Sequence, residues 1–244
     1  MTQMCTLLFS LIIQSLRAGD LPNQLSPSPE TTGASTNQLL RQVGPGEFAL
    51  GNLKLDKKHR TLTFPITLNR VEGPMEYLLV TSHGKIHESI FRTENKPEDI
   101  HIAMLLLGAT GAETNSIQGA IEGPVSHPSK EIVHGDPVAV SVKWMLNGKE
   151  NDLPAEALIF NQQTRSTPKP GNWVYNGSVV WQGKFMAQLE GSIASLITDK
   201  TALINNIANG HDNDQVWAVN TNRLPPADLE LKMTIRLEDR PKVE

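Results

Sequence analysis

Short segments in which apolar and polar residues alternate make up most of the chain after about residue 50. The clearest lies at 228–237, where every second side chain from Leu229 to Leu237 is apolar. A period of two is typical of a β-strand with one buried face. The same reasoning predicts further strands at 137–146, 173–181, 184–189 and 192–197, while residues 155–160 and 201–209 fit either a strand or a helix.

Two β-hairpins are predicted in the first half of this region. The first joins residues 51–55 to 61–68 through a polar turn at 56–59. The second joins residues 75–81 to 86–92 through a turn at 82–85, in which Gly84 can take a positive φ.

One segment changes to a helical period. Pro97 and Glu98 suit a first helical turn, and apolar residues then recur at helical spacing from Ile100 to Leu107. Together these patterns predict an α+β fold that is mainly β, with a single antiparallel or mixed sheet and one clear helix at about 96–108.

The first 42 residues differ from the rest of the chain. An apolar run from Leu7 to Leu16 is too short for a membrane span of about 20 residues but fits a signal peptide over residues 1–18. Residues 19–42 are rich in Pro, Ser and Thr and predict a flexible linker, which leaves one domain at 43–244. We therefore expect an exported protein, periplasmic or extracellular, without a transmembrane span. Because no Lys or Arg precedes the apolar run, a non-cleaved N-terminal helix remains an alternative.

Charge and cysteine content exclude several classes of function. The chain has 22 Lys and Arg against 26 Asp and Glu, a net charge of −4, so no basic field favours nucleic acid binding. Cys5 is the only cysteine. A disulfide framework, a thiolate zinc site and a four-cysteine iron–sulfur cluster are therefore excluded, and we expect no cofactor.

A polar cluster at the second predicted turn holds the candidate binding residues. In the predicted strand, Glu88 shares a face with Ile86 and Ile90, so its carboxylate points inward and needs a partner, either Arg92 or backbone N–H groups of the following helix. The candidate ligand-binding residues are Lys85, His87, Glu88, Ser89 and Arg92.

Three other interpretations of this cluster remain open. Glu88 could simply attach the hairpin to the helix. A metal site could draw on His83, His87, Glu88 and His101, although Gly84 between the first two argues against their convergence. Ser89 lacks the Gly-x-Ser-x-Gly surroundings of an activated nucleophile. We therefore assign no catalytic and no metal-binding residue.

The expected function is that of an exported, non-enzymatic envelope domain that binds a small ligand or an envelope protein. The alternative is a metal-assisted or acid/base hydrolase that uses His87 and Glu88. A purely structural envelope component is a third possibility.

Three blocks of sequence resemble the YdjY-domain family of exported bacterial proteins. They are GPMEYLLV at 73–80, GKIHES at 84–89 and IHIAMLLLG at 100–108, and two later blocks at 173–178 and 214–220 extend the similarity. The resemblance implies export and a single YdjY-like domain, and it implies no reaction. A ferredoxin-like label sometimes attached to this family implies a cysteine-ligated cluster, which a chain with Cys5 alone cannot hold.

Overall fold

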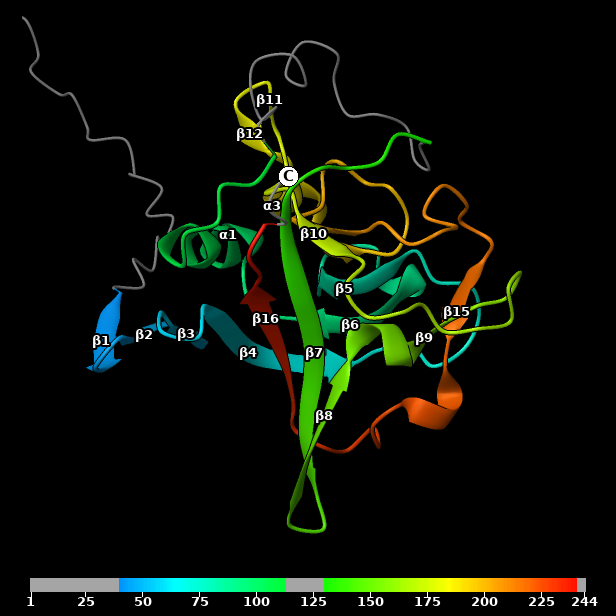
Figure 1. Cartoon of the computed structure of the whole chain (residues 1–244), viewed down its shortest axis with the longest axis horizontal. Coiled ribbons are helices and arrows are strands. Elements are labelled where there is room, and N and C mark those ends of the chain that lie inside the picture. The colour runs from blue at the N-terminus through cyan, green and yellow to red at the C-terminus, as the bar shows by residue number, and fades with distance from the viewer. Residues whose placement is uncertain (1–39, 113–129, 241–244) are drawn as a thin grey trace, which may run out of the picture. The chain divides into compact units, whose positions relative to one another are not determined.

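A single large β-sheet is the main feature of the computed structural model, which describes residues 40–112 and 130–240 (Figure 1). The strands of this sheet are β1 (Arg41–Gly44), β2 (Glu47–Leu50), β3 (Leu53–Asp56), β4 (Thr61–Leu68), β5 (Tyr77–Thr81), β6 (Ser89–Thr93), β7 (Asp136–Leu146), β8 (Lys149–Pro154), β10 (Trp173–Tyr175), β13 (Ser192–Ser195), β14 (Ile204–Asn206) and β16 (Leu231–Leu237).

Smaller elements surround this sheet. Two-stranded sheets pair β11 (Val180–Trp181) with β12 (Lys184–Phe185) and β9 (Ile159–Asn161) with β15 (Trp217–Val219). The helices of the described residues are α1 (Pro97–Leu106) and α3 (Met186–Glu190), and 3₁₀ turns lie at Ile86–Glu88, Ala155–Leu158 and Thr221–Arg223. Neither helix is long and apolar enough to cross a membrane.

Within the described residues, eight strands close into a barrel. The order around the ring is β4, β16, β7, β10, β14, β13, β5 and β6, and β6 pairs with β4 to complete it. The meander β1–β3 extends from β4, and β8 extends from β7. Most neighbours are antiparallel, but β5 with β6 and β13 with β14 are parallel. The predicted α+β, mainly β fold with a mixed sheet is confirmed.

The apolar side chains at alternate positions of the strands form the core, as the sequence predicts. On β16, Met233 lies opposite Phe64 of β4 and Val142 of β7, and all three side chains are buried. Burial of each such side chain stabilises the fold by about 1.5–3 kcal/mol. The intervening residues of the same strands face away from the core, and several of them form the floor of a groove.

The first predicted hairpin and the helix are also confirmed. Strands β3 and β4 pair antiparallel with Leu55 opposite Leu62. Helix α1 begins at Pro97, and Ile100, Ala103 and Met104 are its buried apolar residues.

The second predicted hairpin is wrong. Strands β5 and β6 are present, but they run parallel, with Leu79 opposite Phe91. The segment between the two strands does not form a single tight turn. It runs back along the barrel through the 3₁₀ turn Ile86–Glu88, so that β6 starts beside the start of β5. Strand β6 then lies between β5 and β4 and runs antiparallel to β4. Gly84 does not take the expected positive φ; its Cα packs against Gly191, and a Cβ there would lie 3.0 Å from the Gly191 carbonyl oxygen.

The predicted strand at 184–189 is mostly helical. Only Lys184–Phe185 is extended, and α3 follows until Gly191 ends it with φ +72°. Alternation over so few residues does not exclude one helical turn, and the burial of Met186 and Ala187 together favours the helix here. The predicted strand at 173–181 is interrupted after Tyr175, the segment 155–160 is a 3₁₀ turn followed by β9, and the segment 201–209 contains β14.

Candidate functional site

The parallel arrangement of β5 and β6 changes the environment of the predicted binding residues. Ser89 is fully buried and its hydroxyl donates to the Phe91 carbonyl at 2.7 Å, so it is not available to a ligand. Glu88 does not point inward between two buried isoleucines, because Ile86 belongs to the 3₁₀ turn and is 41% exposed. Strand alternation therefore does not apply to residues 86–88.

Arg92 is not the partner of Glu88. Its guanidinium contacts the Ser82 hydroxyl at 3.4 Å and the Glu94 carboxylate at 3.7 Å. His87 is exposed, and its Nε2 lies 3.4 Å from Glu88 Oε1. The structure therefore keeps His87 with Glu88 and separates both from Ser89 and Arg92.

The neighbour of Glu88 that the sequence did not indicate is Glu76, just before β5. The Glu76 backbone N–H donates to the Glu88 carbonyl at 3.0 Å, and the two carboxyl groups lie within hydrogen-bonding reach. Burial and the adjacent Glu88 carboxylate raise the pKa of Glu76, although Lys85, whose Nζ lies 3.8 Å from Glu76 Oε2, acts in the opposite direction. The structure therefore holds the Glu76 carboxyl group close to a second carboxyl group and to one ammonium group.

Lys85 also contacts a buried pair of hydrogen-bonded side chains, Tyr77 and Asp199. Its Nζ donates to the Tyr77 hydroxyl at 3.3 Å, and that hydroxyl donates to Asp199 Oδ2 at 2.9 Å. Tyr77 and Asp199 are both fully buried, and burial together with Asp199 raises the pKa of Tyr77. The tyrosine is therefore a permanent donor to the carboxylate. We call Glu76, Tyr77, Lys85, Glu88 and Asp199 the Lys85 cluster.

The histidines considered for a metal site have other partners. His83 contacts the Thr81 hydroxyl at 3.1 Å and the Gln188 carbonyl at 3.3 Å. His101 Nδ1 lies 2.6 Å from the Tyr175 hydroxyl, and burial lowers the pKa of this histidine. Among residues 40–112 and 130–240, no three His, Cys, Asp or Glu side chains are grouped so that they could hold a metal ion.

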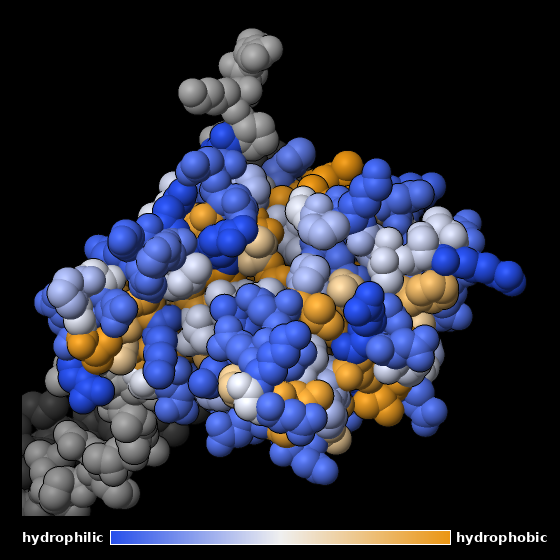
Figure 2. All heavy atoms as spheres, turned by 60° about the horizontal axis from the view of Figure 1, so that its bottom comes forward, coloured by the Kyte–Doolittle hydropathy of each residue, from blue (hydrophilic) through white to orange (hydrophobic). Residues whose placement is uncertain are grey.

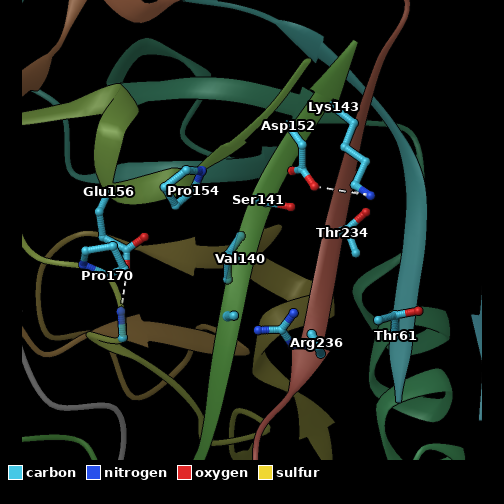
Figure 3. A pocket seen from close by; sticks show the side chains of 12 residues that line it. Thr61, Val140, Ser141, Lys143, Asp152, Pro154, Glu156, Pro170, Thr234 and Arg236 are labelled. Carbon is cyan, nitrogen blue, oxygen red and sulfur yellow. Dashed lines mark hydrogen bonds and ion pairs between the residues drawn. The ribbon is translucent and has the colours of Figure 1, made fainter. Parts of the chain in front are cut away.

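A second polar site is a groove of about 410 Å³ on the face of β4, β16 and β7 opposite their core side chains (Figure 3). Its floor carries three hydroxyl groups, on Thr61, Ser141 and Thr234, and the cations Lys143 and Arg236. Its volume is in the range of small-molecule sites, about 300–1,000 Å³.

One wall of the groove comes from β8 and the segments around it. Asp152 of β8 pairs with Lys143, Oδ2 to Nζ, at 3.3 Å. The Glu156 carboxylate, in the 3₁₀ turn that follows β8, is only 2% exposed. Its Oε1 accepts the Gly171 N–H at 2.9 Å and the Asn172 N–H at 3.4 Å, whereas its other oxygen is directed toward the groove (Figure 3).

Figure 2 shows one face of the molecule coloured by hydropathy. That face is largely hydrophilic, and its apolar side chains form small separate patches. A polar groove with a buried carboxylate is therefore better defined as a site than any patch on this face.

Sequence reasoning missed both Glu156 and the groove. Alternation shows that Ser141 and Thr234 face away from the core, but it cannot show that their strands are neighbours. Glu156 lies in the segment 155–160, for which strand and helix were both open. The only sequence signal was an acidic residue between apolar Ala155 and Leu158.

Comparison with known proteins gives one match. Neither the curated proteins nor the solved structures contain a match to the chain. The family model of the YdjY domain matches residues 53–236. This span begins at β3, ends one residue before the end of β16, and includes the Lys85 cluster, the groove and all other residues of the barrel strands. The chain therefore belongs to the YdjY domain family.

Proposed function

We propose that this chain is an exported, non-enzymatic domain of the cell envelope that binds a small polar ligand in the groove on β4, β16 and β7. The composition of residues 1–42 supports export. The observation that carries the binding role is Glu156, a carboxylate that is almost fully buried and yet directs one oxygen toward the groove. This oxygen makes no hydrogen bond to the residues that the structure describes, so a donor group of a ligand can bind to it.

The remaining groups suit recognition of a ligand. Lys143 is paired with Asp152, and Arg236 is held by two hydrogen bonds to Glu238 Oε1 at 2.9 and 2.6 Å. Such pairs fix the orientation of their side chains and leave their outer donors and acceptors directed at whatever lies in the groove. Rigid strands beneath them keep the site preorganised.

The test is a thermal-shift screen of amino acids, nucleosides, sugars and carboxylic acids against purified protein. Ala139 lines the groove, so Ala139→Trp fills it; Ala227, exposed in the loop before β16, provides the matched control Ala227→Trp. We expect at least one compound class to raise the melting temperature of the wild type and Ala227→Trp but not of Ala139→Trp. Stabilisation that survives Ala139→Trp, or no stabilisation by any class, contradicts the proposal.

A second candidate function is acid/base hydrolysis at the Lys85 cluster. It is favoured by one observation, the contact between Glu76 and Glu88 together with the raised pKa of Glu76. Paired carboxyl groups with separated proton affinities are common in acid/base catalysis.

Hydrolysis of p-nitrophenyl acetate, phosphate and glycosides by the wild type, Glu76→Gln, Glu88→Gln and His87→Ala decides between the two functions. Turnover that is lost in the glutamate variants while their circular dichroism is unchanged supports the hydrolase. If turnover is absent, or is the same in all four proteins, the hydrolase function is rejected.

A further inference from the structure

We infer that the ligand of the groove is a neutral, hydroxyl-rich molecule, that is, a saccharide. This inference rests on the proposed binding function and adds the chemical class of the ligand. Three observations support it: the acceptor that Glu156 offers to a ligand, the charges around the groove and the hydroxyl groups on the groove floor.

Glu156 offers a hydrogen-bond acceptor to a ligand in the groove. Within the described residues, its hydrogen bonds all go to Oε1, which accepts the N–H groups of Gly171 and Asn172. The second oxygen is directed toward the groove (Figure 3). A hydroxyl, an amide N–H or a cation can serve as the donor; a ligand with acceptors only cannot.

The charges around the groove disfavour an ionic ligand of either sign. Lys143 and Arg236 repel a cationic group that approaches Glu156, and Glu156 and Asp152 repel an anionic group that approaches the lysine and the arginine. These four side chains sum to zero formal charge, and Arg236 is also paired with Glu238. Like charges brought together in a partly desolvated site cost binding energy, so a neutral ligand is favoured.

The floor matches hydroxyl groups in particular. Thr61, Ser141 and Thr234 present hydroxyls from three adjacent strands, and each hydroxyl can donate and accept. The Thr234 hydroxyl already lies 3.0 Å from the Thr63 hydroxyl, which shows that this row of residues exchanges hydrogen bonds across strands. Pro154 and Pro170 contribute apolar rings to the wall, against which the C–H face of a sugar ring can pack. Amide ligands lack this combination of neighbouring hydroxyls and apolar C–H faces.

The experiment is a glycan array that includes neutral and acidic oligosaccharides, followed by calorimetric titration. The titration probes are the neutral glycan that binds best, tetragalacturonate as an anionic probe and tetralysine as a cationic probe. We expect the neutral glycan to bind the wild type and both charged probes to bind at least tenfold more weakly.

Glu156→Gln is the decisive variant. A glutamine retains an oxygen for the Gly171 N–H and places an NH₂ donor where the carboxylate oxygen accepted, so the wall is preserved and only the polarity toward the ligand is reversed. We expect the dissociation constant to rise about 10-fold to 100-fold. Glu47→Gln, at an exposed position of β2 outside the groove and the Lys85 cluster, is the matched control and is expected to leave binding unchanged. Should Glu156→Gln fail to fold, Thr234→Val removes a floor hydroxyl at constant shape, and a loss of at least threefold is expected.

The outcomes separate this inference from the proposed function. If a charged probe binds and Ala139→Trp abolishes that binding while no neutral glycan binds, the groove is a binding site and the ligand class is wrong. If a neutral glycan binds equally well to Ala139→Trp, the location is wrong as well. If no glycan on the array binds, or if Glu156→Gln folds and binds as tightly as the wild type, the inference is overturned.

Discussion

The hydrogen bond between Tyr77 and Asp199 provides a direct test of the Lys85 cluster. It joins β5 to the segment before β14, its length is 2.9 Å, and both side chains are fully buried. Replacing Tyr77 by Phe keeps the ring and removes the hydroxyl, so a buried carboxylate oxygen loses this donor. Hydrogen bonds to charged groups contribute about 1.5–3 kcal/mol, and a buried acceptor that loses its donor costs a similar amount. We expect Tyr77→Phe to lower the free energy of unfolding by about 2–3 kcal/mol, out of about 5–15 kcal/mol for a typical domain.

Urea unfolding followed by tryptophan fluorescence and circular dichroism measures this loss. Tyr175→Phe is the matched control: Tyr175 is equally buried, but its hydroxyl contacts the imidazole of His101, and its removal is expected to cost only about 1 kcal/mol. A double-mutant cycle with Asp199→Asn then isolates the coupling between Tyr77 and Asp199. If Tyr77→Phe costs no more than Tyr175→Phe, and the coupling is below about 0.5 kcal/mol, the reasoning is refuted.

Three further predictions concern charge and backbone conformation. The raised pKa of Glu76 means that the folded state binds its proton more tightly than the unfolded chain, so stability falls as the pH rises above about 4.5. This fall should be smaller in Glu76→Gln, and parallel urea profiles between pH 4 and 7 would contradict the prediction. Burial alone would raise the pKa of Asp136, but backbone N–H groups and Arg240 lower it overall. The Asp136 carboxylate therefore stabilises the fold at pH values above 3.8, its pKa in the unfolded chain, and this stabilisation is lost at lower pH. Asp136→Asn should lower the free energy of unfolding more at pH 6 than at pH 2.5. Equal losses at the two pH values would refute this prediction. Gly191→Ala places a methyl group against the Thr81 hydroxyl at φ +72° and should cost about 3 kcal/mol by thermal unfolding. Gly108→Ala shares the positive φ without any contact within 4 Å and should cost about 1 kcal/mol; similar values for the two variants would show that the contact is unimportant.

Local patterns predicted several elements correctly because the residues involved are neighbours in the chain. Strand β16 follows from four apolar side chains at alternate positions, and β4 follows from Leu62, Phe64 and Ile66 in the same way; the predicted strand at 228–237 begins three residues later, at Leu231. The hairpin β3–β4 needs only a short polar turn between two such segments. Helix α1 follows from Pro97 in its first turn and apolar residues at helical spacing.

The candidate sites were less predictable, because their residues are far apart in the chain. Lys85 and Glu88 were identified as part of a polar cluster, but their partners Glu76 and Asp199 were not, and 122 residues separate Tyr77 from Asp199. Ser89 was predicted to be available to a ligand, but β6 is buried on both of its faces, which alternation within the strand did not indicate. The groove combines residues from Thr61 to Arg236, and no short motif connects them.

The sequence alone therefore determined the long alternating strands such as β4, β7 and β16, helix α1, and the apolar faces of these elements, since these depend on side chains one to four positions apart. Only the tertiary structure decided which strands are neighbours. The placement of β6 between β5 and β4 made β5 and β6 parallel, converted residues 86–88 into a 3₁₀ turn and exposed Ile86. Which distant strands pair depends on how the whole barrel buries its apolar side chains. The alternation within one strand is compatible with many partner strands and with both parallel and antiparallel pairing.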